Sequence, residues 1–310
     1  MSDFITKREL LFLYESKFSI PNGDPFTGEQ RYDDATKKVL VSDVRIKRFI
    51  RDYLEKNGEL IFVSDSSLDT KKEKKKKSKK GVSGASARYT AICENLGIDE
   101  KDSSSTKKVL DNVIDLRLFG GIVTAEGNNL AFTGPVQFAL LNPSLNKVNL
   151  RIHQNTSVFV SSTDNKQGAI GTTSVVPYSL NQIIGWVNPY SAQETQLAEE
   201  DVKKMLDAMW KSINLANTRS KSNQRSLLLL SINYANSNDK LYGFDQSIEL
   251  KPKIEEEDIR TYDEYDLDFN KLFDLVKSAK VKEVEFYTEV DDLKKIFDSQ
   301  DKFKFAKYIS

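Results

Sequence analysis

Four basic side chains recur at helical spacing in one short stretch, and together they could bind the phosphates of a nucleic acid. They are Arg45, Lys47, Arg48 and Arg51. At about 100° per residue, Lys47, Arg48 and Arg51 fall on one side of a helix, with Arg45 on its flank. Such contacts position a nucleic acid without reading its bases. A basic face can equally be simply solvated, and the pattern alone leaves both interpretations open.

The helix that carries these cations is predicted to follow a turn-rich loop and a short strand at 39–42. Ser42 is a suitable N-cap and Gly58 a suitable stop. Apolar residues face the other way at helical spacing: Ile46, Phe49, Ile50, Tyr53 and Leu54. Asn22-Gly23-Asp24-Pro25 is a turn signal, because Asn and Gly tolerate positive φ and Pro cannot extend a strand. Backbone amides of the loop and the helix N-terminus could also hold anions.

The remaining elements complete a mixed fold. Residues 8–20 are predicted as a first core strand, and 226–234 as a strand buried on both faces. Residues 115–124 and 129–141 are predicted as two strands, and 198–214 as a helix with an apolar stripe. The order strand, helix, strand, strand, helix, strand is the ferredoxin-like or RRM-like βαββαβ pattern. We therefore expect an α+β fold. This fold by itself predicts no function, because it occurs in proteins of many functions.

Glycine-containing pairs interrupt the two middle strands. Gly120-Gly121 indicates a bulge or the close approach of another backbone, and Gly134-Pro135 should break the second strand. Phe119, beside the first pair, is either a core residue or a platform on which a base stacks.

Changes of composition divide the chain into regions. We expect an RRM-like palm from 1–57, 111–144 and 193–250, an inserted finger at 58–110, a protruding β-hairpin thumb at 145–192 and an acidic α/β extension at 251–310. The stretch 70–81 holds eight lysines and one glutamate, so it is either disordered through self-repulsion or a cationic finger touching phosphates. The acidic stretch 255–268 is either a solvated face or a partner for a basic neighbour.

Composition narrows the class of protein. The 310 residues carry 46 basic and 46 acidic side chains, so binding to nucleic acid depends on where the cations lie and not on their number. With one cysteine, Cys93, and one histidine, His153, neither an internal disulfide nor a paired-histidine metal site can form. P-loop and dinucleotide fingerprints are missing, and we expect neither cofactor nor metal. The longest apolar run, at 227–232, is too short to span a bilayer, and we expect a cytoplasmic protein.

Several short segments resemble one family in the same order along the chain. They are NGDP, VSDVRIKRFIRDYL, DLRLFGG, FTGPVQF and TRSK. They resemble the CRISPR-associated protein seven family (DevR-like, Csh-type), the crRNA-binding backbone subunit of type I-B Cascade. The resemblance implies a non-catalytic protein that polymerises head to tail along crRNA, contacts other Cascade subunits and supports recognition of target DNA by guide pairing. It also implies a hairpin thumb that presses into the bound guide and displaces bases.

The resemblance also implies which residues bind the guide. The expected RNA-binding residues are Asn22, Gly23, Ser42, Arg45, Lys47, Arg48, Arg51, Phe119, Gly120, Gly121, Gln137, Arg219 and Lys221. In the thumb, Val160, Lys166 and Ile170 are the candidates for contact with the displaced bases.

Two other functions stay open at this point. Type III relatives of the family cut target RNA with an aspartate in the loop after the first strand, where this chain has Asp24, Asp33 and Asp34. A carboxylate in an NGDP turn, however, already has a structural role. The other alternative is a monomeric RRM-like RNA-binding module that does not assemble.

Overall fold

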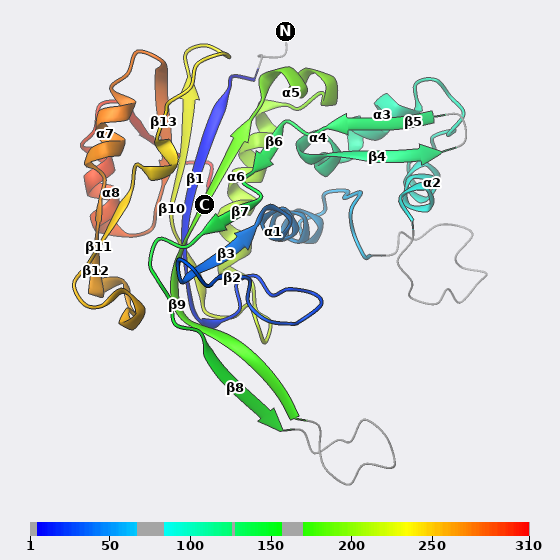
Figure 1. The fold of residues 1–310 in the computed structure, drawn as a ribbon. Helices are drawn as coiled ribbons and strands as arrows, with labels where there is room; N and C mark the ends of the chain where they lie inside the picture. Colours follow the sequence, from blue (N-terminus) through cyan, green and yellow to red (C-terminus); the bar gives the residue numbers. More distant parts are fainter. Residues whose placement is uncertain (1–4, 67–83, 126–127, 157–169, 310) are drawn as a thin grey trace, which may run out of the picture.

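A seven-stranded sheet forms the centre of the molecule (Figure 1). The structure is a computed structural model that describes residues 5–66, 84–125, 128–156 and 170–309. The strands follow one another in the order β14, β13, β10, β1, β9 and β6, and β8 pairs with β9. Their bounds are β1 Arg8–Ser19, β6 Val136–Phe138, β8 Arg151–Thr156, β9 Ile170–Val187, β10 Gln224–Tyr234, β13 Val281–Tyr287 and β14 Phe303–Phe305.

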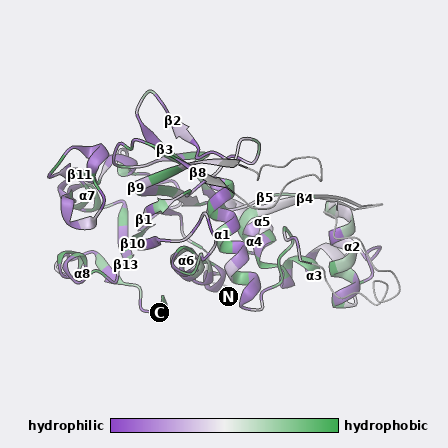
Figure 2. Ribbon diagram, turned by 90° about the horizontal axis from the view of Figure 1, so that it is seen from below, coloured by the Kyte–Doolittle hydropathy of each residue, from purple (hydrophilic) through white to green (hydrophobic). Residues whose placement is uncertain are grey.

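Two helices, α1 (Asp43–Lys56) and α6 (Glu199–Asn214), share a core with one face of this sheet. Figure 2 shows them side by side. Strands β10, β1, β9 and β6 are antiparallel neighbours. Along the chain α1 lies between β1 and β6, and α6 between β9 and β10. This is the split βαβ arrangement, and the predicted α+β, ferredoxin-like core is confirmed.

The apolar stripe of α1 decides how the helix is turned. Ile46, Phe49, Ile50 and Leu54 are buried in one core with residues of α6, including Trp210. Full burial of one such side chain contributes roughly 1.5–3 kcal/mol. Burial of four such side chains contributes more than the surface charges of α1. Burial therefore fixes the rotation of the helix, and with it the direction in which the basic face points.

The middle strands differ from the prediction. Residues 114–119 form a short helix, α4 (Ile114–Phe119), and not the start of a strand. An apolar run such as DLRLF fits either period, and here Ile114 and Leu118 are buried in the α1–α6 core while Leu116 packs into a second cluster. As predicted, the chain breaks at Gly134-Pro135, since β5 (Asn128–Thr133) ends before it and β6 begins after it.

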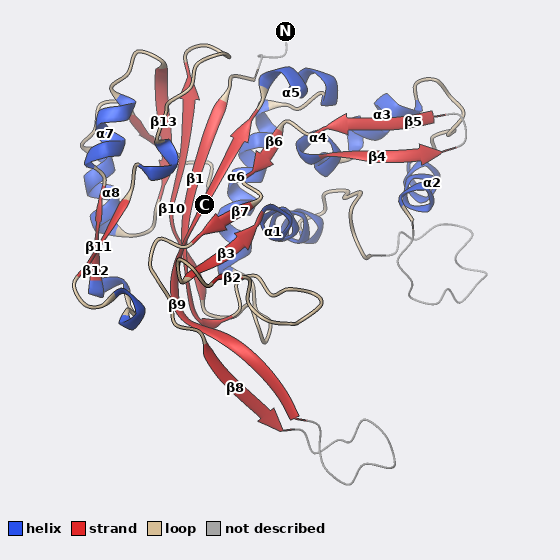
Figure 3. Cartoon of the chain, in the orientation of Figure 1, coloured by secondary structure: helices blue, strands red, loops and turns tan. Residues whose placement is uncertain are grey.

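The third strand of the core is β9, which lies inside the range predicted as the thumb. Its first part, 170–175, pairs with β8, whereas its continuation from Val176 to Val187 pairs with β1. Residues of this second part are buried on both faces of the sheet, as Leu180 and Ile183 show. The range 145–192 is therefore both a projecting hairpin and a central strand (Figure 3).

A second arm projects from the other side of the body (Figure 3). It contains α2 (Ala85–Leu96), α3 (Ser105–Asn112), β4 (Gly120–Ala125) and β5, with α4 at its base. Tyr89, Ile92, Val109 and Leu116 form its own small core. The whole predicted lysine tract, 70–81, lies outside the described residues.

The C-terminal segment covers the opposite face of the central sheet. It adds β13 and β14 to the sheet and packs β12 (Tyr265–Asp268), α7 (Asn270–Val276) and α8 (Asp291–Asp298) into a core with Leu11 and Leu13. Strand β11 (Glu249–Pro252) pairs with β12. Part of the acidic stretch has intramolecular partners, because Glu256 pairs with Lys147 at 3.4 Å and Glu257 with Lys37 at 3.1 Å.

Candidate nucleic-acid interface

The loop after β1 is held together by its own polar side chains. Asn22 is buried, and its Oδ1 accepts hydrogen bonds from the Ser42 backbone N–H and the Ser42 hydroxyl, both at 2.7 Å. The Ser42 hydroxyl in turn accepts from the Arg45 N–H at 3.3 Å, which makes Ser42 the N-cap of α1 as predicted. The side chains of Asn22 and Ser42 thus join the loop to the helix that carries the cations.

Asp24 has a structural role in the same loop. Its Oδ1 accepts from the N–H groups of Phe26 and Thr27 at 2.9 and 3.4 Å, and its Oδ2 pairs with Arg31 at 2.9 Å. The Phe26 amide, with Thr27 and Arg31, holds the pKa of Asp24 below its usual range. Asp24 is therefore an ionised turn-forming carboxylate.

Lys47 and Arg51 of the basic face are turned inward, toward β6 and the base of the second arm. Lys47 donates to Gln137 Oε1 at 2.8 Å and pairs with Asp43 at 3.4 Å, and its side chain is only 12% exposed. Burial lowers the pKa of Lys47, an effect that Asp43 opposes. Gln137 Nε2 donates onward to the Gly134 carbonyl at 2.9 Å.

Arg51 continues this inward cluster. Its Nε donates at 2.9 Å to Asp115, whose side chain is fully buried. Asp115 also accepts from the N–H groups of Phe62 and Val63 at 2.7 and 3.1 Å. The Arg51 guanidinium lies 4.9 Å from the ring centre of Phe119, and Lys47 lies 5.6 Å from it. Phe119 is 7% exposed, so it is a core ring covered by cations and is not free to stack on a base.

The glycines near Phe119 allow two backbones to touch. A Cβ on Gly120, which has φ +71°, would lie 2.2 Å from the Phe132 carbonyl oxygen. A Cβ on Gly134 would lie 2.0 Å from the Phe119 carbonyl carbon. The predicted close approach of another backbone at Gly120 is therefore confirmed. We call Lys47, Arg51, Asp115, Phe119 and Gln137 the closed cluster.

Arg45, in the first turn of α1, is placed differently from Lys47 and Arg51. Arg45 lies over the ring of Phe49, 3.7 Å from its centre, and burial lowers the pKa of its guanidinium. Within the described residues Arg45 has no carboxylate in ion-pair range, and its buried Nε lacks a hydrogen-bond partner. By contrast, Lys47, Arg48 and Arg51 each pair with at least one aspartate.

Lys221, on a loop distant in sequence, is close enough to Arg45 for the two charges to repel each other. Its Nζ donates to the Ile20 carbonyl, and no described carboxylate pairs with it. Burial and the nearby charge of Arg45 lower the pKa of Lys221 to about 8. Two cations that repel each other, with no acid between them, form a site that favours an anion. We call Arg45 and Lys221 the open pair.

Sequence reasoning missed residues around the open pair. Burial raises the pKa of Tyr14 in β1, and the positive charge of Arg45 opposes this shift. The buried Tyr14 hydroxyl and Ser19 hydroxyl find no hydrogen-bond partner among the described residues. Both residues lie on β1, which the sequence predicts as a core strand. Their polar atoms were the only signal of a further role. Buried polar groups are nearly always satisfied, and such atoms need an explanation.

The other predicted residues lie apart from these two groups. Arg48 is exposed and pairs with Asp52 and Asp65 at 2.6 and 3.0 Å, and Arg219 is exposed on the loop that carries Lys221. In the thumb, Val160 and Lys166 lie outside the described residues, and Ile170 pairs with Thr156 at the start of β9.

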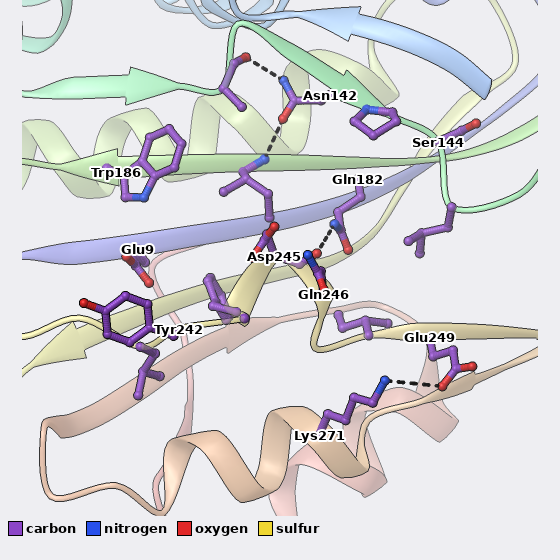
Figure 4. A pocket seen from close by; sticks show the side chains of 18 of the residues that line it. Glu9, Asn142, Ser144, Gln182, Trp186, Tyr242, Asp245, Gln246, Glu249 and Lys271 are labelled. Carbon is purple, nitrogen blue, oxygen red and sulfur yellow. Dashed lines mark hydrogen bonds and ion pairs between the residues drawn. The ribbon is translucent and has the colours of Figure 1, made fainter. Parts of the chain in front are cut away.

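A cavity of about 680 Å³ lies on the opposite face of the sheet, under the C-terminal segment (Figure 4). In its polar lining, Gln182 donates to the Asp245 carbonyl at 2.7 Å and Lys271 lies 3.9 Å from Glu249, while the buried Gln182 Oε1 has no hydrogen-bond partner among the described residues. Trp186 lines its apolar wall. The cavity therefore belongs to a different surface from the open pair.

Two kinds of site are absent from the described residues. These residues contain no group of three or more His, Cys, Asp or Glu side chains placed to hold a metal ion. No helix among them is both long enough and apolar enough to cross a membrane.

Comparison with known proteins gives the family. The family model of CRISPR-associated protein Cas7 matches residues 6–270. The chain belongs to the Cas7 family. The Cas7 protein of Haloferax volcanii is 27% identical over 274 residues, which are 79% of this chain and 76% of that protein. A chain of a solved CRISPR RNA-guided surveillance complex, pre-nicking, shares 12% identity and covers 92% of both chains with a TM-score of 0.54. The family predicted from the sequence is confirmed, and the solved structure supports the same fold.

Proposed function

We propose that this chain is a non-catalytic, crRNA-binding backbone subunit of a type I Cascade surveillance complex, of the type I-B kind, in the cytoplasm. Its copies would polymerise head to tail along the guide, beside other Cascade subunits. The guide would read target DNA by base pairing, while the protein holds its backbone. Membership of the Cas7 family and the ferredoxin-like core support this proposal.

The open pair is the observation that carries the proposal for RNA. The charges of Arg45 and Lys221 repel each other beside the loop after β1, and neither side chain has a carboxylate partner among the described residues. A phosphate placed there would relieve the repulsion between the two charges and supply hydrogen-bond acceptors. Contacts with phosphate serve a guide of any sequence, as a backbone subunit requires.

The closed cluster has a supporting part in this proposal. Arg51 is paired with Asp115 and so holds the base of the second arm against α1, whereas Lys47 is paired with Asp43 and joins α1 to Gln137 of β6. Arg48 and Arg219 remain exposed cations that could add weaker, salt-screened contacts along the same strand of RNA.

The salt dependence of RNA binding tests the proposal. We expect Arg45→Ala/Lys221→Ala to weaken binding to single-stranded RNA at least tenfold and to make the slope of log K against log salt shallower by about 0.7, for one lost phosphate contact. Lys277→Ala/Lys295→Ala is the matched control. It removes the same charge from two exposed sites of the C-terminal segment and should leave the slope unchanged. An unchanged slope in Arg45→Ala/Lys221→Ala would show that Arg45 and Lys221 do not contact phosphate and are simply solvated.

Two further measurements separate the alternatives. A backbone subunit gives complexes that grow with RNA length, because a heterologous interface that does not close forms a filament. A monomeric RNA-binding module keeps one size on short and long RNA. For cleavage, wild type and Asp24→Ala should both leave end-labelled target RNA intact, and cleavage that disappears in Asp24→Ala would establish the ribonuclease.

A further inference from the structure

Phe18, at the end of β1, combines features that a packing residue would not have. It has φ +44°, in the left-handed region that bulky residues avoid. It is 61% exposed and belongs to none of the hydrophobic clusters of the described residues. A phenylalanine held in a strained conformation with its ring in water is a candidate for a functional contact.

The position of Phe18 links it to the open pair. The Lys17 N–H donates to the Asn223 carbonyl at 2.9 Å, and the Ile20 N–H donates to the Ser220 carbonyl at 2.8 Å. Phe18 lies between the two residues that donate these hydrogen bonds, and Lys221 lies between the two residues that accept them. Lys221 itself donates to the Ile20 carbonyl. Phe18 is therefore fixed at the loop that brings Lys221 to Arg45.

The backbone around Phe18 is held and does not simply fluctuate into this conformation. Lys17 and Ser19 both pair with β9, opposite Tyr178 and Val176. Asn223, the partner of Lys17, also has a positive φ of 56°. Ordered neighbours on both sides impose the left-handed conformation on Phe18 and fix where its ring is presented.

We propose that Phe18 is a stacking platform for one nucleobase of the RNA whose phosphate lies at the open pair. The inference rests on the proposed function and adds a contact to a base. An aromatic face beside a cationic phosphate site is the arrangement by which proteins bind single-stranded nucleic acid without sequence choice. Stacking tolerates any base, because every base has a π-face. The platform would hold a nucleotide in register along the guide.

Fluorescence of 2-aminopurine tests this inference. In a short RNA substituted at one position at a time, we expect one position to be quenched on binding to wild type. Phe18→Ala should restore that fluorescence and lower the affinity about tenfold, whereas Phe18→Trp should keep both. Tyr242→Ala is the matched control, because Tyr242 is an 80% exposed aromatic residue on the cavity face of the sheet. It should change neither quantity.

Stability separates a platform from a packing residue. Phe18→Gly should leave the melting temperature unchanged or raise it, because glycine adopts positive φ without strain. A marked fall in melting temperature would show that the ring supports the fold, and would overturn the proposal.

Other outcomes also decide the matter. If Phe18→Ala binds RNA as wild type does while Arg45→Ala/Lys221→Ala does not, the platform is wrong and the RNA-binding function stands. If both variants bind as wild type does, the proposed function fails as well. If Phe18→Ala keeps its affinity for a short RNA but forms smaller complexes on a long one, Phe18 contacts a neighbouring protein and the stacking role is refuted.

Discussion

The closed cluster and the open pair, which both include cations of α1, hold the same kind of side chain in opposite circumstances. At the closed cluster, Arg51 is 13% exposed and paired with a fully buried aspartate. At the open pair, the charges of Arg45 and Lys221 repel each other, with no described acid in ion-pair range of either. A cation already paired with a buried acid adds little to the binding of RNA, because moving it breaks the pair. A cation without a partner gains from any anion that arrives.

The comparison changes how a basic helix face should be interpreted. Helical spacing treats Arg45, Lys47, Arg48 and Arg51 as one surface, but their partners divide them into structural and available charges. Asp115 and Asp43 make the difference, one from the base of the second arm and one from the first turn of α1. Counting cations would therefore overestimate the phosphate-binding surface.

The largest effect should come from the backbone contact that builds the closed cluster. We expect Gly134→Ala to destabilise the protein by about 4 kcal/mol or more, because its Cβ would lie 2.0 Å from the Phe119 carbonyl carbon. Soluble yield and thermal melting measure this. Gly84→Ala is the control, since no described atom lies within 4 Å of its added Cβ. A Gly134→Ala protein that melts like wild type would show that the two backbones can separate freely.

Arg51→Ala should have the next largest effect, and on stability first. Removing Arg51 leaves the Asp115 carboxylate buried without its cation, which costs about 3 kcal/mol. Urea denaturation should show the loss as a lower midpoint. Arg45→Ala, which breaks no ion pair among the described residues, should cost less than about 1 kcal/mol. Equal losses in the two variants would remove the distinction between the closed cluster and the open pair.

The pH dependence of RNA binding probes the open pair. Lys221 has a pKa of about 8 in the folded protein, so it loses its charge between pH 7 and 9. RNA affinity should fall about tenfold over that range, because phosphate binds only the charged form tightly. Lys221→Arg should flatten the profile, since arginine stays charged. A wild-type profile as flat as that of Lys221→Arg would contradict a phosphate contact at Lys221.

Stability should move the other way with pH. Folding lowers the pKa of Lys221 below its unfolded value, so the unfolded chain binds more protons between pH 8 and 10.5. The Lys221 contribution to the free energy of unfolding therefore rises across this window, and the difference between wild type and Lys221→Arg in denaturation experiments isolates it.

Arg48→Ala should have the smallest effect. Its side chain is 46% exposed, and its partners Asp52 and Asp65 are 39% and 72% exposed, so stability should change by less than about 0.5 kcal/mol. RNA affinity should fall less than about threefold at physiological salt, because exposed charges are screened. A loss as large as that of Arg45→Ala would place Arg48 with the open pair.

The sequence by itself determined the elements with a strong local signal. The apolar period of α1 and α6, the N-cap at Ser42 and the break at Gly134-Pro135 were all predictable, because each depends on residues a few positions apart. The family followed from short motifs in sequence, and the βαββαβ order was predicted with 115–124 and 129–141 as its middle strands, where the structure has β6 and β9. The four cations of α1 were visible in the same way.

Tertiary structure alone decided which strands fill the centre and which cations are available. β9 is both thumb and core strand because its second half finds β1 as a partner, and no local pattern records that pairing. Asp115 neutralises Arg51 across 64 positions of sequence, and Lys221 reaches Ile20 across 201. Ion pairing and burial act through space, so the charge that a side chain offers to a ligand is fixed only when the chain has folded.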